Sequence, residues 1–218
     1  MRLVFFGPPG AGKGTLAAKI CEVGQLAHLA SGEMLREAVR LKTALGSEAE
    51  GFMNQGELVP DELVSRMIFE KLEAGAGGFI LDGFPRTDTQ AKQLDAKLAS
   101  LKQSLDLAIY FKTSEAKVIE RLSGRRVCEA CGANYHLVNV RPAKEGICDR
   151  CGKTLIQRKD DLPETIHQRL TVYDEEAAPV LAHYKAKGLI RPVDGDLAIE
   201  PLHELLMKLF QDEGLLKE

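Results

Sequence analysis

Four cysteines form two closely spaced pairs, Cys128 with Cys131 and Cys148 with Cys151, and each pair is followed by a glycine. Two Cys-x2-Cys pairs at this separation have the spacing of a structural tetrathiolate metal site. Zinc is the default ion, although Fe²⁺ or Co²⁺ also fits tetrahedral sulfur. Disulfides or unrelated free thiols are the alternative interpretation. The surrounding insert, about residues 127–157, is too short for a hydrophobic core, so a bound metal would supply its stability.

A second group of chemically suggestive residues lies near the N-terminus, where Gly7-x4-Gly12-Lys13 follows the apolar run 2–6. In a strand–loop–helix unit, glycines let backbone N–H groups converge on a phosphate, and the helix dipole adds attraction. Lys13 would reach the outer phosphates. Gly14 stands where serine or threonine usually follows the lysine, and Thr15 comes one place later. The pattern predicts a nucleotide site, against the alternative of a glycine-rich turn without a ligand.

Six arginines recur at the ends of predicted elements. A single arginine is usually a solvated surface charge, but six beside a phosphate loop favour phosphoryl transfer, which needs positioned substrates and neutralised phosphate oxygens. Asp82 ends a predicted strand, where a carboxylate could orient a Mg²⁺-bound water; its alternative role is capping a turn. No Cys–His or Ser–His pair indicates a covalent nucleophile. The six arginines are Arg36, Arg86, Arg121, Arg125, Arg158 and Arg169.

The elements that would position these residues alternate along the chain. Apolar runs that predict buried strands lie at 2–6, 25–30, 79–81, 107–111 and 189–193, with helical patterns between them. This alternation predicts an α/β fold with a doubly wound parallel sheet and ligands at the carboxyl ends of its strands. The helix starts are predicted from local signals, namely Ser31 as an N-cap and the capping boxes Thr87-x-x-Gln90 and Asp161-x-x-Glu164.

Composition limits the classes of function. With 218 residues and 44% hydrophobic content, the chain can build one good core and a small appendage. A net charge of −3 offers no basic footprint for nucleic acid, and no apolar run approaches a membrane span. The N-terminal apolar run leads into the phosphate loop, so it is not a signal peptide. We therefore expect a cytoplasmic protein whose five cysteines serve metal binding or catalysis.

Four motifs together resemble those of the adenylate kinases, more narrowly the bacterial long form with a metal-bearing lid. They are Gly7-Pro-Pro-Gly-Ala-Gly-Lys-Gly-Thr15, Leu81-Asp-Gly-Phe-Pro-Arg-Thr87, Gly124-Arg-Arg-Val127 and Arg158-Lys-Asp-Asp161. The resemblance covers essentially the whole chain, and glycine after the lysine is the normal form in that family. It implies a P-loop nucleoside-monophosphate kinase fold with a core (1–29, 60–121 and 160–218), an AMP-binding flap (30–59) and a lid (122–159).

The resemblance also implies the reaction MgATP + AMP ⇌ 2 ADP, which maintains adenine nucleotide balance, in a monomer. By position, ATP would be bound by Gly10, Ala11, Gly12, Lys13, Gly14, Thr15, Arg121, Arg125 and Leu197. AMP would be bound by Ser31, Arg36, Val59, Gly83, Arg86, Gln90, Arg158 and Arg169. The catalytic set would be Lys13, Asp82, Arg86, Arg125, Arg158 and Arg169, and the lid metal would bind Cys128, Cys131, Cys148 and Cys151. Ser31 and Leu197 depart from the commoner residues, threonine and a polar side chain.

Three rival functions remain from the sequence. One is another monophosphate kinase, or an AMP kinase that uses GTP; the long insert argues against the short-lid uridylate/cytidylate kinases but leaves the donor open. The second is a zinc-ribbon regulator that binds nucleic acid, which the acidic balance and the lack of basic–aromatic clustering disfavour. The third is a zinc-stapled scaffold with a dead site, which Lys13, Asp82 and the six arginines oppose.

Overall fold

The computed structural model describes residues 1–75 and 77–216; positions 76 and 217–218 of the predicted core segments lie outside the described residues. The strands are β1 (Arg2–Phe6), β2 (Ala27–Ala30), β3 (Phe79–Asp82), β4 (Leu107–Lys112), β5 (Arg125–Cys128), β6 (Asn134–His136), β7 (Leu155–Ile156) and β8 (Ile190–Asp194). The helices are α1 (Lys13–Gly24), α2 (Ser31–Arg40), α3 (Ala44–Gln55), α4 (Asp61–Glu73), α5 (Asp88–Ser100), α6 (Glu115–Ser123), α7 (Pro163–Ala186) and α8 (Ile199–Asp212), with a 3₁₀ turn η1 (Lys159–Asp161).

Five of the strands form a central sheet in the order β2-β3-β1-β4-β8, and every neighbouring pair is parallel. Val4 in the middle strand lies opposite Leu81 on one side and Ala108 on the other. Because the strands are parallel, their carboxyl ends meet at one edge of the sheet. This arrangement confirms the predicted doubly wound α/β fold.

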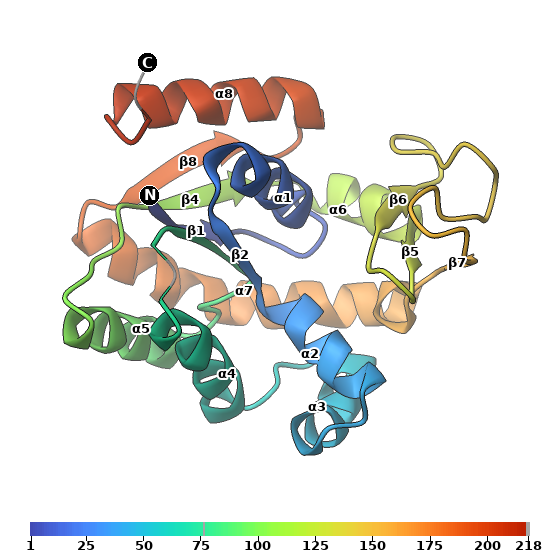
Figure 1. Cartoon of the computed structure of the whole chain (residues 1–218), viewed down its shortest axis with the longest axis horizontal. Coiled ribbons are helices and arrows are strands. Elements are labelled where there is room, and N and C mark those ends of the chain that lie inside the picture. The colour runs from blue at the N-terminus through green and yellow to red at the C-terminus, as the bar shows by residue number, and fades with distance from the viewer. Residues whose placement is uncertain (76, 217–218) are drawn as a thin grey trace.

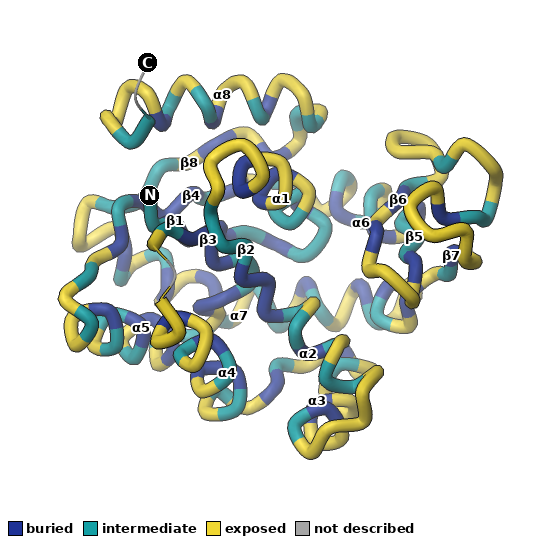
Figure 2. Tube along the Cα trace, in the orientation of Figure 1, coloured by how far each residue is buried: buried dark blue, intermediate teal, exposed yellow. Residues whose placement is uncertain are grey.

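Alternate residues of β1 supply two hydrophobic clusters, one on each face of the sheet. Leu3 and Phe5 pack in the cluster that includes buried residues of α1 and α8. Val4 and Phe6 pack in the cluster that includes residues of α4, α5 and α7. Figure 1 shows α1 and α8 on one side of the sheet and α4, α5 and α7 on the other. Figure 2 shows β1, β3 and β4 mostly dark with burial between these two layers.

Two smaller units project from the layered core (Figure 1). Helices α2 and α3 form the first, and the second carries an antiparallel sheet in the order β6-β5-β7. These three short strands were not expected from the sequence. Only five buried residues form the cluster beneath them, and two of the five are the metal-candidate cysteines Cys128 and Cys148. The cluster is so small that the insert still needs another source of stability.

The predicted helix starts are confirmed at one position and wrong at two. Thr87 caps α5, because its Oγ1 accepts the Gln90 backbone N–H at 3.2 Å, but the predicted capping box is only half formed, since Gln90 Oε1 accepts the Arg86 N–H in place of the Thr87 N–H. Ser31 is the first residue of α2 rather than its cap; its hydroxyl donates to the Gly83 carbonyl at 2.7 Å. Asp161 does not cap α7, because it is fully buried and pairs with Arg125. Both predictions failed because the side chain binds a group that is distant in the sequence, the Gly83 carbonyl for Ser31 and Arg125 for Asp161.

Helix α7 is the longest element, with 24 residues. Charged residues recur along it, including Glu164, Arg169 and Asp174. Neither α7 nor any other helix in the described ranges combines the length and the hydrophobicity needed to cross a bilayer.

The Tyr184 side chain on α7 is fully buried, and its hydroxyl has no hydrogen-bond partner among the described residues. A buried polar group without a partner costs stability. We therefore expect Tyr184→Phe to raise the free energy of unfolding by about 1 kcal/mol, measured by urea denaturation. Tyr135→Phe is the matched comparison and should destabilise, because the Tyr135 hydroxyl accepts the Asp149 N–H at 2.8 Å. A fall in stability for Tyr184→Phe would contradict the prediction.

Candidate functional site

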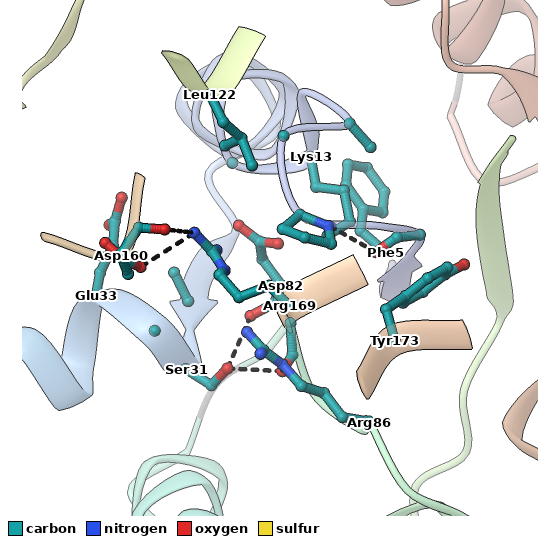
Figure 3. Close-up of a pocket in the computed structure, with 18 of the residues that line it drawn as sticks. Phe5, Lys13, Ser31, Glu33, Asp82, Arg86, Leu122, Asp160, Arg169 and Tyr173 are labelled. Carbon is teal, nitrogen blue, oxygen red and sulfur yellow. Dashed lines mark hydrogen bonds and ion pairs between the residues drawn. The ribbon is translucent and has the colours of Figure 1, made fainter. Parts of the chain in front are cut away.

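A cleft of about 330 Å³ lies at the carboxyl ends of β1 and β3, between the core, the α2–α3 unit and the small antiparallel sheet. Of the nucleotide-site residues predicted from the sequence, all except Leu197 line it. Figure 3 shows the side chains of Asp82, Arg86 and Arg169 converging on the same space. The structure therefore brings together groups from distant parts of the chain, as parallel-sheet topology predicts.

The phosphate loop connects β1 to α1, and its glycines adopt conformations that other residues disfavour. Gly12 precedes α1 with a φ of 89°, and Gly10 has a φ of 78°. A Cβ on Gly10 would also lie 2.9 Å from the Leu122 side chain. The loop backbone can approach an anion closely because no side chain intervenes. The helix dipole of α1 points at the same place.

Lys13 begins α1 and curls back into the loop. Its Nζ donates to the carbonyl oxygens of Gly7 and Pro8, both at 2.8 Å. Burial, followed by the nearby arginines, lowers the pKa of Lys13 from its ordinary 10.5 to about 8, although Asp82 acts in the opposite direction. An ammonium group in this environment gains strongly from an anionic ligand, because it has lost much of its hydration.

Asp82 ends β3 beside the phosphate loop. A Cβ on Gly14 would lie 3.0 Å from Asp82 Oδ2, so glycine at position 14 leaves room for this carboxylate. His28 on β2 contacts the same oxygen through Nε2 at 3.5 Å. Burial alone would raise the pKa of Asp82, but the His28 contact and the charge of Lys13 outweigh it and hold this pKa below its usual range. Asp82 is therefore an anionic oxygen donor of the kind that Mg²⁺ prefers.

Asp160 is surrounded by three arginines from different elements. Arg158 binds it with two hydrogen bonds of 2.9 and 2.6 Å, and an Arg169 nitrogen lies 3.2 Å from it. Arg36 on α2 lies 3.9 Å away. Burial, followed by the charge of Arg158, lowers the pKa of Arg36 to about 9. Guanidinium groups packed this closely repel one another, so the cluster is suited to bind anionic oxygens.

Asp161 anchors two further guanidinium contacts. Arg125 at the start of β5 donates to both of its carboxylate oxygens, at 2.7 and 2.5 Å. Arg169 donates to Asp161 Oδ1 at 3.1 Å and to the Asp160 carbonyl at 2.8 Å. Sequence reasoning missed both aspartates as parts of the site, because each resembles an ordinary helix-start residue. Only the neighbouring Arg158 gave a signal, since an acidic pair after a predicted phosphate-binding arginine is a natural partner for it.

A second set of predicted residues occupies the side of the cleft nearest α2, α4 and α5. Arg86 Nε donates to the Gly83 carbonyl at 2.9 Å, and the guanidinium remains in the cleft. Gln90 is only 2% exposed, yet it still lines the cleft. Burial lowers the pKa of Arg86, against the opposing charges of Asp82 and Asp160. Val59, at the end of the α2–α3 unit, closes the wall with an apolar surface.

Arg121 marks the other end of the cleft, where α6 approaches the loop after β8. Its guanidinium donates to the carbonyl oxygens of Gly195 and Leu197 at 2.7 and 2.8 Å. Leu197 takes part only through this backbone oxygen, because its side chain packs against the hydrophobic core. Ile199 lines the cleft instead. The flat guanidinium, fixed by two carbonyls, could stack on an aromatic ring.

Six residues of the segment 122–159 that sequence reasoning did not assign also line the cleft, namely Leu122, Asn134, Tyr135, His136, Asn139 and Val140. His136 Nδ1 accepts the N–H groups of Val138 and Asn139 at 3.0 and 3.1 Å. This contact agrees with the expectation that His136 packs or forms hydrogen bonds and does not bind the metal. The only sequence signal was the short polar–aromatic run 134–136 inside the cysteine insert.

The four cysteines gather in the unit that carries the small antiparallel sheet. Their sulfurs all lie within 4.8 Å of one another, with Cys128 and Cys151 at 3.4 Å and Cys131 and Cys148 at 3.5 Å. Ligands at a tetrahedral zinc–sulfur distance would be separated by about 3.7 Å. The Tyr135 hydroxyl lies 3.6 Å from Cys148 Sγ. The geometry fits a four-coordinate metal ion, and no disulfide joins these thiols.

Comparison with known proteins gives one family. A sequence model described as adenylate kinase matches residues 5–189. The adenylate kinase of Carboxydothermus hydrogenoformans is 46% identical over 213 residues, covering 97% of this chain and all of that protein. Those of Desulfitobacterium hafniense and Oceanobacillus iheyensis are 46% and 48% identical over 198 residues, covering 90% of this chain and 91% and 92% of the relatives.

Proposed function

The chain belongs to the adenylate kinase family and catalyses reversible phosphoryl transfer from MgATP to AMP, giving two ADP, and on this premise we propose the role of each group in the cleft. The observation that carries the assignment is the convergence of Lys13 and several arginines on one cleft with two distinct ends. Phosphoryl transfer needs two substrates held in line and the charge on the transferred oxygens neutralised. A cleft with this arrangement of cations meets both needs.

The donor ATP occupies the phosphate-loop end. The backbone of Gly10 to Thr15 holds its phosphates, and Lys13 neutralises the oxygens nearest the bond that breaks. Arg121 stacks on the adenine, while the Leu197 carbonyl fixes the Arg121 guanidinium. The choice of ATP over GTP is supported by the family assignment rather than by a base-reading side chain at this end.

The acceptor AMP occupies the opposite end. Arg36 and Arg86 bind its phosphate, and Gln90 reads its adenine. Ser31, Val59 and Gly83 form the wall around the nucleoside. The hydroxyl of Ser31 is already used by the Gly83 carbonyl, so its contribution is to hold α2 against β3.

Arg125, Arg158 and Arg169 grip the phosphoryl group during transfer. In the structure these arginines bind Asp160 and Asp161, which hold them in place between the two nucleotide ends. The pKa of Asp160 lies well below its usual range, because its arginine contacts outweigh its burial. The carboxylates therefore pre-organise the cations, and an incoming phosphate competes for the same donors.

The two metals have different roles in this proposal. Mg²⁺ bound with ATP would neutralise charge on the donor phosphates, and the anionic Asp82 would hold the ion through its bound water. The lid metal, which we propose to be Zn²⁺ with Fe²⁺ or Co²⁺ as alternatives, is held by the four cysteines and stabilises the lid. The lid metal contributes no chemistry to the transfer.

The chain divides into a core (1–29, 60–121 and 160–218), an AMP-binding flap (30–59) and a lid (122–159). Closure of flap and lid over the substrates would exclude water, which otherwise would accept the phosphoryl group. The support for two separate units is that α2–α3 and the small antiparallel sheet each project from the layered core.

Three further properties complete the proposal. The enzyme acts as a monomer and binds no nucleic acid, which agrees with its net charge of −3. It works in the cytoplasm, where a reducing environment keeps thiols free to bind a metal, and all five cysteines are free in the structure.

The reaction is tested by measuring ADP formation from MgATP with AMP, GMP, CMP and UMP offered separately. Turnover with AMP alone is expected. Turnover with another acceptor would overturn the role of Gln90 and leave the mechanism unchanged. No turnover with any acceptor, in a folded and metal-loaded sample, would overturn the assignment of the cleft as a kinase site.

Arg86→Ala should raise KM for AMP about tenfold or more, because a charge-assisted contact to the acceptor phosphate is lost. KM for ATP should change little. Steady-state kinetics with each substrate varied in turn measures both constants. Arg66→Ala is the matched control, since Arg66 is exposed on α4 and does not line the cleft. If only the ATP constant moves, the acceptor end has been assigned wrongly.

A further inference from the structure

At the start of α5, the side-chain amide of Gln90 is held by one hydrogen-bond donor and one hydrogen-bond acceptor. The Arg86 backbone N–H donates to Gln90 Oε1 at 2.7 Å. Gln90 Nε2 in turn donates to Asp61 Oδ1 on α4, also at 2.7 Å. The side chain is almost fully buried, so these contacts are not in competition with bulk water.

These partners fix which way the amide points. A carboxylate can only accept and a backbone N–H can only donate, so a reversed amide would face donor with donor and acceptor with acceptor. The Asp61 carboxylate is itself held, because Thr87 Oγ1 donates to Asp61 Oδ2 at 2.6 Å. The same Thr87 oxygen accepts the backbone N–H of Gln90 at 3.2 Å. The bonds of the amide to Arg86 and Asp61 therefore favour one orientation, and Thr87 holds the Asp61 carboxylate in place.

The fixed orientation determines what Gln90 presents to the cleft. One N–H and one oxygen lone pair of the amide remain free for a ligand. Adenine offers an acceptor at N1 beside a donor amino group at C6, whereas a 6-oxopurine offers a donor at N1 beside an acceptor at C6. An amide that cannot reverse accepts one pattern and rejects the other, since the wrong base leaves buried groups unpaired.

We propose that Asp61 is a positioning residue that sets the acceptor-base specificity of the enzyme by locking the amide of Gln90. The inference rests on the proposed role of Gln90 in reading AMP. Asp61 lies in the first turn of α4, immediately after the flap, and it joins α4 to the start of α5 across 29 positions of sequence. Asp61 does not line the cleft, so it would influence recognition of the base only through its hydrogen bond to Gln90.

A different role for Asp61 would be to stabilise α4 through the helix dipole. Glu62 lies in the same first turn but is exposed, and it makes no hydrogen bond to Gln90 in the described chain. Glu62→Gln therefore removes the same kind of helix-dipole charge without touching the amide. This variant separates a helix-stabilising role from a positioning role.

The test compares AMP with inosine monophosphate, which carries the reversed pattern at N1 and C6. We expect Asp61→Ala to lower the AMP-to-IMP ratio of kcat/KM about tenfold, while KM for MgATP stays unchanged. Asp61→Asn keeps the shape of the side chain and should lower the ratio less. Glu62→Gln should leave the ratio unchanged. An unchanged ratio in both Asp61 variants, or an equal fall in Glu62→Gln, would overturn the inference.

A second pair of variants tests whether Asp61 acts through Gln90. In a Gln90→Leu background, Asp61→Ala should cause no further fall in the ratio, because the amide that it positions is gone. A further fall of similar size would overturn the inference. If Gln90→Leu alone keeps the full preference for AMP, the proposed role of Gln90 fails. If Gln90→Leu loses the preference and Asp61→Ala keeps it, only the present inference fails.

Discussion

Lys13→Met is expected to lower kcat about a thousandfold while the protein stays folded. The Lys13 ammonium group lies inside the phosphate loop, and methionine fills a similar volume without the charge. The transferred phosphoryl group would lose a cation at the position where negative charge gathers. Initial rates of ADP formation at saturating MgATP and AMP measure the loss.

The same variant should not lower the melting temperature of the unliganded enzyme. Burial lowers the pKa of Lys13 to about 8 in the folded state, against 10.5 ordinarily, so the charged form is disfavoured by folding. Below the folded pKa both states are protonated and the wild type carries this cost in full. As pH rises from about 8 toward 10.5, the folded lysine is neutral while the unfolded lysine still binds a proton, so the cost disappears. Any stability advantage of Lys13→Met should therefore shrink with rising pH.

Lys19→Met is the matched control for this prediction. Lys19 lies on the same helix, is exposed and pairs with Glu200 rather than with the phosphate loop. We expect nearly normal turnover, because exposed ion pairs contribute little. Near-normal activity of a folded Lys13→Met enzyme would contradict the assigned role of the phosphate loop.

Replacing Cys128 and Cys131 together by serine is expected to abolish metal binding and to unfold the lid, with several kcal/mol of stability lost from it. Only five buried residues form the lid cluster, and Cys128 is one of them. Two ligands are removed at once, so the remaining pair cannot complete a tetrahedral site. Elemental analysis should show a fall from one metal ion per chain to none, and calorimetry should show an earlier transition for the lid.

The core should remain folded in this double variant, because its two hydrophobic clusters contain no residue of the lid. Turnover should also fall in this double variant, since Arg125, at the start of β5, would no longer be held in the cleft when the lid unfolds. Cys21→Ala is the matched control; Cys21 is a buried core thiol remote from the four-cysteine cluster, and its loss should leave the metal content unchanged. Retention of a full metal complement by the double serine variant would refute the four-cysteine site.

Local patterns in the sequence were sufficient to predict the sheet and the phosphate loop. The apolar run of β1 and the glycines after it are contiguous, so strand, loop and helix can be read together. Asp82 was placed correctly at a strand end because the apolar run 79–81 stops there. The shared edge of parallel strands then brings it close to the phosphate loop. The four-cysteine site could also be predicted from the sequence, since the spacing within each Cys-x2-Cys pair is a local pattern.

Contacts between segments that are distant in the sequence could not be predicted from local patterns. Asp61 looks like an ordinary first-turn carboxylate, and only the structure brings it to Thr87 and Gln90. Asp161 fits a capping pattern, yet a buried ion pair with Arg125 takes it instead. In each case the local sequence pattern predicts a helix-start role for the carboxylate. In the structure, that carboxylate binds a side chain tens of positions away along the sequence. Charged residues near helix starts are therefore where pattern-based expectations fail first.

The charge distribution around the cleft affects how substrates arrive. Seven basic and five acidic side chains line it within the described residues, although the whole chain carries a net charge of −3. A nucleotide therefore diffuses past a mildly repulsive surface toward a concave region whose field attracts anions. Such focusing speeds the encounter of small anions and weakens as ionic strength rises, because mobile ions shorten its range. The arginines are thus placed to influence capture from solution as well as the transfer itself.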